Sequence, residues 1–167
     1  MKVFIIAAIT ADGFIARDSE HIADWTEKAD KQLYVRLTKE SGVMVMGAKT
    51  FDTIGRALPG RKTVVYTSHP EKYEAIENVE ATKESPQELI ARLKNEGYKS
   101  VAICGGTKIY TLFMQAGVIT DIFLTVAPVM FGTGLPLFQK QLDYTLHLKS
   151  VEKLGENSIA AHYSVAN

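Results

Sequence analysis

Two hydrophobic periodicities alternate along the first three quarters of the chain. Unbroken apolar runs, such as those at residues 3–9 and 43–46, are typical of strands buried on both faces. Between these runs, apolar residues recur every three or four positions, which is the spacing of a helix with one face on a core. The alternation predicts an α/β fold. By the same criteria we expect further strands at 63–67, 100–104 and 122–129, and helices at 24–41, 50–54, 85–97 and 108–116.

The last part of the chain has the two-residue period of strands with one exposed face. Residues 144–154 and 158–165 show this alternation on either side of a Gly-Glu-Asn-Ser turn at 155–158. We therefore expect an antiparallel hairpin at the edge of the sheet, with His147 and His162 on the faces of its strands.

Capping signals mark two helix starts. Asp24 and Glu27 have the spacing of a capping pair for the helix predicted at 24–41. Ser85 and Glu88 form a capping box with a proline in the first turn, so a second helix is expected to begin there.

An acid falls on the apolar stripe of the first helix. Asp30 is in register with Leu33, Tyr34 and Leu37, at spacings of three, four and seven residues. A carboxylate on a buried stripe is a candidate proton-handling group, or an anchor for a ligand with paired N–H donors. The alternative is an acid at the edge of the stripe, near the helix start, where the helix dipole alone favours it.

A strand, two glycines and a helix follow one another at residues 100–116. Gly105 and Gly106 would let the backbone approach a phosphate closely, the helix start offers unpaired N–H groups, and Lys108 adds positive charge. Such a step also often forms no more than a tight turn.

A second step of this kind strengthens the hypothesis of a phosphate site. The strand predicted at 43–46 runs into Gly47, Lys49 and Thr50 at another helix start. Open α/β sheets bind ligands at the carboxyl ends of their strands, so the two helix starts could hold the two ends of one dinucleotide.

Composition narrows the function classes. The 167 residues, 46% of them hydrophobic, suit one domain with a sizeable core. Lys plus Arg and Asp plus Glu number 19 each, so we expect no nucleic-acid and no membrane partner. A single cysteine, Cys104, fits a reducing, cytoplasmic location and a core thiol. The four histidines lack metal-ligand spacing, so we expect no metal. The sequence contains no Gly-x-Ser-x-Gly elbow, so nothing in it indicates a hydrolase.

Several motifs occur in the order in which one enzyme family has them. Trp25 is followed by Asp30 five residues later, and residues 54–62 read IGRALPGRK. Residues 5–8 (IIAA), 45–47 (VMG) and 105–110 (GGTKIY) complete the series. From residue 2 to about 125 the chain resembles a dihydrofolate reductase.

The resemblance implies a dihydrofolate reductase-like three-layer fold, formed by residues 1–167 as a single domain. Its central sheet would be mostly parallel, with helices on both faces and a C-terminal antiparallel hairpin. The implied activity is that of an oxidoreductase that uses NADPH to reduce 7,8-dihydrofolate to 5,6,7,8-tetrahydrofolate, with hydride transfer to C6 and protonation at N5. It would serve tetrahydrofolate biosynthesis and one-carbon metabolism and be a target of antifolates. The expected partner is the small-molecule substrate, and the expected assembly is a monomer or weak homodimer.

Asp30 matches the active-site acid of that family. A pterin ring presents N3 and its 2-amino group side by side, and one carboxylate can accept from both. In the family this acid also promotes protonation of N5, while the cofactor supplies the redox chemistry. The resemblance assigns catalytic positions to Asp30, Trp25, Thr125 and Tyr110, with the Thr125 hydroxyl supporting the acid.

The remaining site positions come from the same resemblance. Tyr34 would pack on the aminobenzoyl group, and Arg61 would pair with the glutamate carboxylate. The substrate-binding positions are Ile6, Ala8, Asp30, Tyr34, Ile54, Arg61, Cys104 and Thr125. The positions implied for NADPH are Ala8, Ile15, Gly47, Lys49, Thr50, Thr67, Ser68, His69, Gly105, Gly106, Thr107, Lys108 and Ile109.

Two departures from the family pattern bear on function. Where the family usually has an arginine for the extra phosphate of NADPH, this chain has Ala48, so Lys49, Ser68, His69 and Lys108 would have to compensate.

After Thr125, residues 128–138 (PVMFGTGLPLF) resemble the related pyrimidine reductases of riboflavin synthesis, as do residues 12–16 (DGFIA). The alternative function is therefore reduction of 5-amino-6-ribosylaminouracil phosphate or of another pteridine or pyrimidine. A third hypothesis is a non-catalytic nucleotide-binding module.

Overall fold

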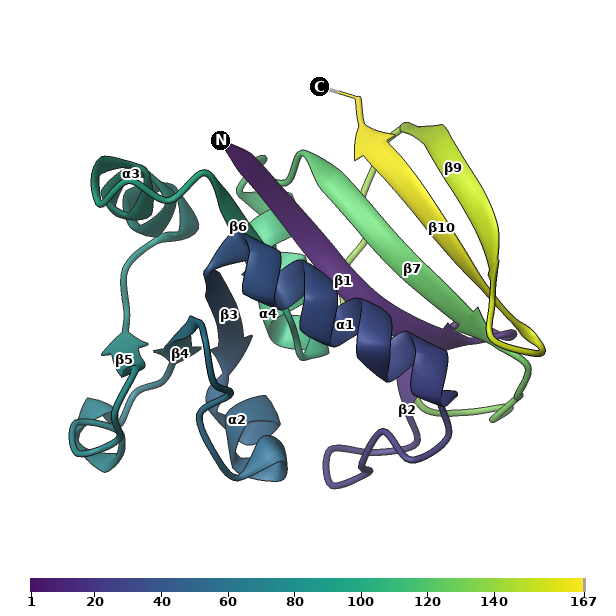
Figure 1. The fold of residues 1–167 in the computed structure, drawn as a ribbon, viewed down its shortest axis with the longest axis horizontal. Coiled ribbons are helices and arrows are strands. Elements are labelled where there is room, and N and C mark those ends of the chain that lie inside the picture. The colour runs from purple at the N-terminus through teal and green to yellow at the C-terminus, as the bar shows by residue number, and fades with distance from the viewer. Residues whose placement is uncertain (167) are drawn as a thin grey trace.

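One large twisted sheet organises the computed structural model, which describes residues 1–166 (Figure 1). Its strands are β1 (Lys2–Thr10), β3 (Val43–Gly47), β4 (Lys62–Tyr66), β5 (Val79–Thr82), β6 (Ser100–Ile103), β7 (Asp121–Ala127), β9 (Leu146–Leu154) and β10 (Ser158–Val165). They are ordered β5-β4-β3-β6-β1-β7-β10-β9. All pairs from β5 to β7 are parallel, whereas β10 is antiparallel to both β7 and β9.

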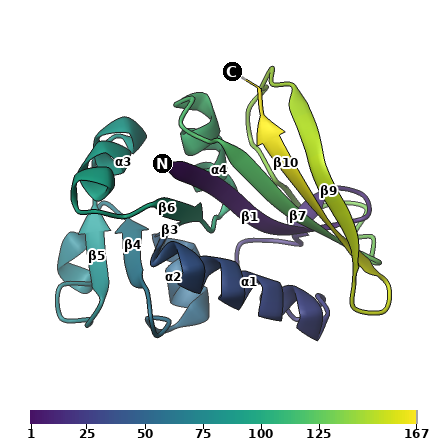
Figure 2. The same ribbon diagram turned by 45° about the horizontal axis from the view of Figure 1, so that its top comes forward.

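Helices cover both faces of this sheet (Figure 2). One face packs against α1 (Lys28–Ser41) and α2 (Ala48–Ile54), and the other against α3 (Pro86–Asn95) and α4 (Thr107–Gln115). Along β1 the side chains alternate between the two cores, because successive residues of a strand point to opposite faces. The predicted α/β architecture, with a mostly parallel sheet and helices on both faces, is confirmed.

The predicted C-terminal hairpin is confirmed as β9 and β10. The pair lies at the end of the sheet, and β9 is the outermost strand. His147 lies on β9 and is exposed, whereas His162 lies on β10 and is half-buried. The His162 ring stacks on Phe123 at a centroid distance of 4.1 Å, and its Nε2 lies 2.7 Å from Asp121 Oδ1.

The start of the first helix was predicted incorrectly. α1 begins at Lys28 rather than at Asp24, and the predicted Asp24–Glu27 capping pair does not form. Glu27 is the N-cap residue, but its carboxylate binds the turn between β9 and β10 instead of capping its own helix. By contrast, Ser85 and Glu88 form the predicted capping box of α3.

Most other predicted bounds shift by one or two residues, and the predictions missed three short strands. β5 has only four residues and a mixed polar sequence. The other two, β2 (Phe14–Ala16) and β8 (Leu135–Pro136), pair as a separate ribbon. Strands this short give almost no periodic signal.

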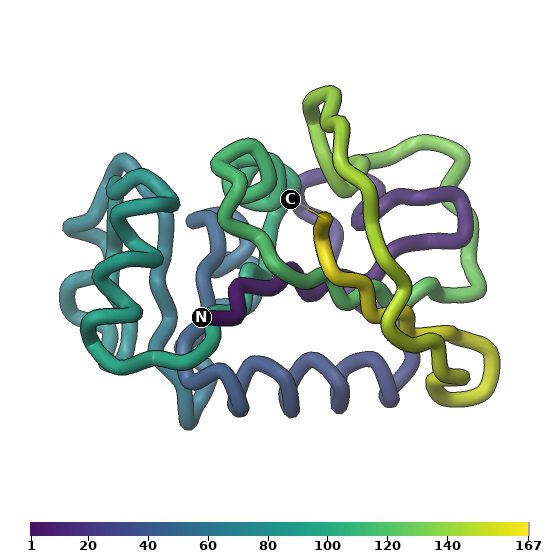
Figure 3. The backbone as a smooth tube through the Cα atoms, turned by 90° about the horizontal axis from the view of Figure 1, so that it is seen from above, coloured from purple at the N-terminus to yellow at the C-terminus, as the bar shows by residue number. Residues whose placement is uncertain are grey.

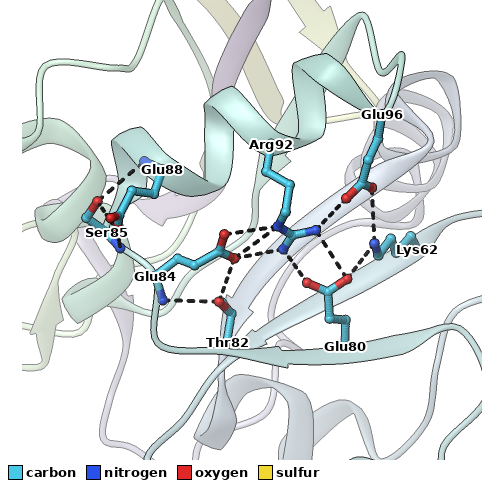
Figure 4. Close-up of polar contacts among 8 residues, drawn as sticks. All are labelled: Lys62, Glu80, Thr82, Glu84, Ser85, Glu88, Arg92 and Glu96. Atoms are coloured by element: carbon cyan, nitrogen blue, oxygen red, sulfur yellow. Dashed lines mark hydrogen bonds and ion pairs between the residues drawn. The ribbon is translucent and has the colours of Figure 1, made fainter.

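A group of ion pairs fastens α3 to the β4–β5 edge of the sheet (Figure 4). The Arg92 guanidinium contacts the carboxylates of Glu80, Glu84 and Glu96, with Nη2–Oε2 at 2.7 Å for Glu84 and Nη1–Oε1 at 2.6 Å for Glu96. Lys62 Nζ lies 2.5 Å from Glu80 Oε2 and 3.3 Å from Glu96 Oε2. Five charged side chains thus form one network. They come from β4, from β5, from the turn between β5 and α3, and from the C-terminal end of α3.

Residues 1–166 contain neither a membrane-spanning helix nor a cluster of potential metal ligands. None of the helices in this range has the length and apolar character needed to cross a membrane. Within the same range no three His, Cys, Asp or Glu side chains are grouped so that they could hold a metal ion.

Candidate active site

Asp30 lies in the first turn of α1, on the side that faces the sheet. Leu33 is buried and Tyr34 and Leu37 are half-buried, so the predicted apolar stripe is present. Asp30 itself is half-buried, and its backbone N–H donates to Glu27 O at 3.1 Å. The structure thus unites the two interpretations, because the acid stands on the inward stripe and also benefits from the helix dipole.

Tyr110 shares the environment of this acid. The phenol is 5% exposed, and its hydroxyl donates to the Ile6 carbonyl at 2.8 Å. Burial raises the Tyr110 pKa well above its ordinary value, with further contributions from the nearby Cys104 and Asp30 side chains. A phenol from α4 is therefore fixed on β1, within reach of the charge on α1.

Cys104 and Tyr34 fill the space between α1 and the end of β6. Burial raises the pKa of the Cys104 thiol to about 12, so the thiol stays protonated at neutral pH and is not a nucleophile. Burial also raises the pKa of Tyr34, with a further contribution from the adjoining Cys104 thiol. Tyr34 thus packs from α1 against the core at the end of β6, at the carboxyl edge of the sheet.

Arg61, which the resemblance assigns to a glutamate carboxylate, is buried. Its exposed fraction is 6%, and Nη1 donates to Val35 O at 3.0 Å and to Thr38 Oγ1. Its Nε is buried without a hydrogen-bond partner. Burial raises the pKa values of Tyr34 and Cys104, and the positive charge of Arg61 partly offsets this rise, so the guanidinium lies near the same space.

Two further predicted catalytic residues, Thr125 and Trp25, lie on β7 and in the segment before α1. Thr125 is 3% exposed on β7 and is in register with Ala8 of β1 and Ala160 of β10. Trp25 precedes α1 and packs edge-to-face on Phe131, with ring centroids 5.3 Å apart.

The two glycine steps meet as predicted. Gly47 N donates to Gly105 O at 2.8 Å, and this bond joins the end of β3 to the loop before α4. A Cβ on Gly106 would lie 3.3 Å from Thr50 Oγ1, so a side chain there would crowd the start of α2. The starts of α2 and α4 are thus adjacent at the carboxyl edge of the sheet.

Thr107 shows how the cradle formed by the adjacent starts of α2 and α4 fits a cofactor phosphate. It is the first residue of α4 and is 6% exposed, and its Oγ1 is buried without a hydrogen-bond partner. An unpaired buried hydroxyl beside the N–H groups of a helix start suits a phosphate oxygen. Lys49 and Lys108 are exposed and add positive charge nearby. The residues present therefore fit a dinucleotide cofactor.

The remaining predicted cofactor positions are less uniform. Thr67, Ser68 and His69 follow β4, and Thr67 Oγ1 accepts from His69 N at 3.0 Å. His69 Nδ1 lies 3.2 Å from Glu71 Oε1, and an acid at this place opposes phosphate binding. Ile109 is buried in the core on the α3–α4 side of the sheet, and half-buried Ile15 packs against the same core. Ile54, a predicted substrate position, is half-buried and packs against the core on the α1–α2 side.

A group of contacts that was not predicted from the sequence holds the loop before α1. The Asp12 carboxylate accepts from Thr10 Oγ1 at 2.5 Å, from Phe131 N at 3.1 Å and from Gly132 N at 2.7 Å. The Phe131 ring contacts Trp25 and also His21, whose centroid is 5.5 Å away. The Asp-Gly turn at residues 12–13 was the local signal available, but its partner lies about 120 residues away in sequence.

Comparisons with known proteins agree with this geometry. The family model described as dihydrofolate reductase matches residues 2–154. The uncharacterized protein YwjB of Bacillus subtilis (strain 168) is 28% identical over 171 residues, which cover 97% of both chains.

Two solved structures share the fold. A putative riboflavin biosynthesis protein from Shewanella sp. PV-4 has a TM-score of 0.81 at 22% identity, covering 100% of both chains. A pyrimidine reductase-like protein from Corynebacterium diphtheriae has a TM-score of 0.79 at 18% identity, covering 99% of this chain and 92% of the other.

Proposed function

Because the chain belongs to the dihydrofolate reductase family, we propose that it is an NADPH-dependent reductase of a pteridine or of a substituted pyrimidine. We propose further that its substrate is the pyrimidine alternative, 5-amino-6-ribosylaminouracil phosphate. The observation that carries this proposal is a single juxtaposition. Asp30 lies near enough to Tyr110 for its charge to contribute to the raised pKa of the Tyr110 phenol. Tyr110 in turn lies one turn into α4, directly after the glycine step at Gly105–Thr107 that is proposed to bind phosphate.

Asp30 is assigned to binding and orienting the ring. In a 6-ribosylaminouracil, N1–H and the N–H on C6 lie side by side, and a carboxylate can accept from both. When C1′ of the opened ribosylamino group accepts the hydride, its imine nitrogen must take up a proton, and Asp30 can hold that proton. Tyr34 would pack against the ring, and Tyr110 would line the junction between ring and cofactor. The cradle of Gly106, Thr107 and Lys108 would bind the cofactor's phosphates, and NADPH would supply the hydride.

Three findings support the pyrimidine over the folate. The relatives with solved structures that match nearly the whole chain are described as a riboflavin biosynthesis protein and a pyrimidine reductase-like protein. Residues 128–138 resemble the pyrimidine reductases in sequence. Moreover, Nη1 of Arg61 is already bonded to α1, which leaves fewer donors for a glutamate carboxylate.

Dihydrofolate is the second candidate substrate. The observation in its favour is the unpartnered Nε of buried Arg61, since a carboxylate could accept from this donor. The family model that matches the chain is described as dihydrofolate reductase. A pterin also offers Asp30 a pair of adjacent N–H donors, as the ribosylaminouracil does.

The test is NADPH oxidation, followed by its absorbance, with each substrate in turn. The proposal expects turnover with the ribosylaminouracil phosphate, and replacement of Asp30 by asparagine should abolish most of it. Turnover with dihydrofolate alone would transfer the assignment to the second candidate. Tight NADPH binding without turnover of either would indicate a nucleotide-binding module, and no NADPH binding would contradict both enzyme assignments.

A further inference from the structure

We propose that Glu27 is a positioning residue, whose carboxylate fixes the first turn of α1, and with it Asp30, against the turn between β9 and β10. This inference rests on the proposed function. It concerns a residue that the family resemblance did not assign to the site.

Glu27 holds the hairpin turn with a dense set of hydrogen bonds. Its Oε1 accepts from Glu156 N at 3.1 Å, and its Oε2 accepts from Ser158 N at 3.0 Å and from Ser158 Oγ. Asn157 N lies 3.4 Å from both oxygens. These bonds lower the pKa of the Glu27 carboxyl, the largest cause being the Ser158 hydroxyl. The site is therefore built for an ionised carboxylate.

The hairpin turn is shaped to let this carboxylate approach. Gly155 has a φ of +68°, which favours glycine, and a Cβ there would lie 3.0 Å from Glu27 Oε2. Ser158 is only 1% exposed. Figure 3 shows that this turn lies beside the beginning of α1, although the two segments are far apart in the sequence.

The position of Glu27 along the chain links this contact to the candidate site. It lies two residues after Trp25 and three before Asp30. Its backbone carbonyl accepts from Asp30 N at 3.1 Å and from Lys31 N at 3.4 Å. The same residue thus holds the first turn of the helix through its backbone and the hairpin through its side chain.

The hairpin in turn leads to the other predicted catalytic strand. Ser158 begins β10, and Ala160 of β10 is in register with Thr125 of β7. Through Glu27, the turn that carries Asp30 is tied to the strand pair that carries Thr125. Catalytic groups need placement to within roughly 0.5 Å, so a loosened clamp should affect turnover more than cofactor binding.

The test compares Glu27→Gln with Glu156→Gln. The control removes a carboxylate from the same turn but keeps the backbone N–H that Glu27 binds. For Glu27→Gln we expect kcat to fall about tenfold or more and the pH profile of kcat to move, with the KM for NADPH within about twofold. Amide exchange should quicken in residues 28–31 and 155–158 together. The control should change none of these quantities.

A second variant tests the same clamp without changing charge. Gly155→Ala should displace the Glu27 carboxylate by a few tenths of an ångström and strain the turn at its φ of +68°, and it should reproduce part of the loss of kcat. Unchanged exchange in Glu27→Gln would overturn the inference. So would quickened exchange with wild-type kcat and pH profile, because Glu27 would then be structural only. If the wild-type protein turns over neither substrate, the proposed function fails instead, a result distinct from an active wild type with an unaffected variant.

Discussion

Carboxylates fasten two regions of the sheet, but their partners differ. At the β4–β5 edge, Glu80, Glu84 and Glu96 are paired with the cations of Arg92 and Lys62 (Figure 4). On the β1–β9 side of the sheet, Asp12 binds the nearby Thr10 hydroxyl and two backbone N–H groups of the distant 131–132 loop, and Glu27 binds backbone N–H groups and the Ser158 hydroxyl at the turn between β9 and β10. The ionic arrangement joins the ends of long, flexible side chains. In the other arrangement, one short carboxylate side chain binds the backbone N–H groups of a distant segment and so holds two stretches of backbone together.

This difference separates stability from function. Ion pairs between partly exposed side chains are screened by salt and add modest stability. The backbone clamps hold the two ends of the segment from residue 12 to residue 27, which leads into Asp30. We therefore expect changes at the ionic edge to alter stability alone, and changes at the backbone clamps to alter catalysis.

The largest expected difference is between Asp30→Asn and Glu84→Gln. The first should lower turnover about a hundredfold or more, because it removes the group that holds the proton, while NADPH binding stays nearly constant. The second removes a similar charge from the ionic network and should leave turnover intact. Steady-state kinetics and NADPH titration of both proteins provide the comparison. Full activity in Asp30→Asn would remove the acid from the mechanism.

A smaller effect is expected at the cofactor cradle. Thr107→Val removes the unpartnered buried hydroxyl and should weaken NADPH about fivefold, the equivalent of ~1 kcal/mol for one hydrogen bond. Thr53→Val is the matched control, because the Thr53 hydroxyl donates within α2 to Lys49 O at 2.9 Å. Equal NADPH affinity in both variants would place the phosphates elsewhere.

At the ionic edge, Arg92→Met should lower the free energy of unfolding by about 1 kcal/mol, a figure that allows for solvent screening of partly exposed pairs. Urea denaturation at low and high salt checks this value. The difference from wild type should shrink at high salt, and kcat should not change. A drop in kcat would show that the two regions are coupled.

The smallest expected effect is on the acid limb of stability. Arg92 hydrogen bonds lower the pKa values of Glu84 and Glu96 from their ordinary 4.5 in the folded protein. Their contribution is therefore present above pH 4.5 and is lost as the pH falls through the lowered values. Below pH 4.5, wild type should lose stability more steeply than Arg92→Met, as urea midpoints at several pH values would show. Parallel curves would mean that Arg92 is not the cause.

The sequence was sufficient for features encoded by neighbouring residues. The Ser85 capping box, the alternation along β9 and β10, and the glycine steps at Gly47 and Gly105 all give local signals. The start of α1 was misplaced because the Glu27 side chain bonds to the turn at residues 156–158 rather than to its own helix. These partners are separated from Glu27 by 129 to 131 positions in the sequence. Likewise, the burial of Arg61 depends on acceptors in α1, 23 and 26 residues earlier. Such tertiary partners leave no periodic trace.

Transfer of label from NADPH deuterated at C4 of the nicotinamide tests the central claim most directly. The label should pass into the ribosylaminouracil phosphate, so that the product isolated from wild type gains one deuterium by mass spectrometry, and Asp30→Asn should yield almost none in the same time. NADPH that binds but leaves no deuterium in this product would contradict the account.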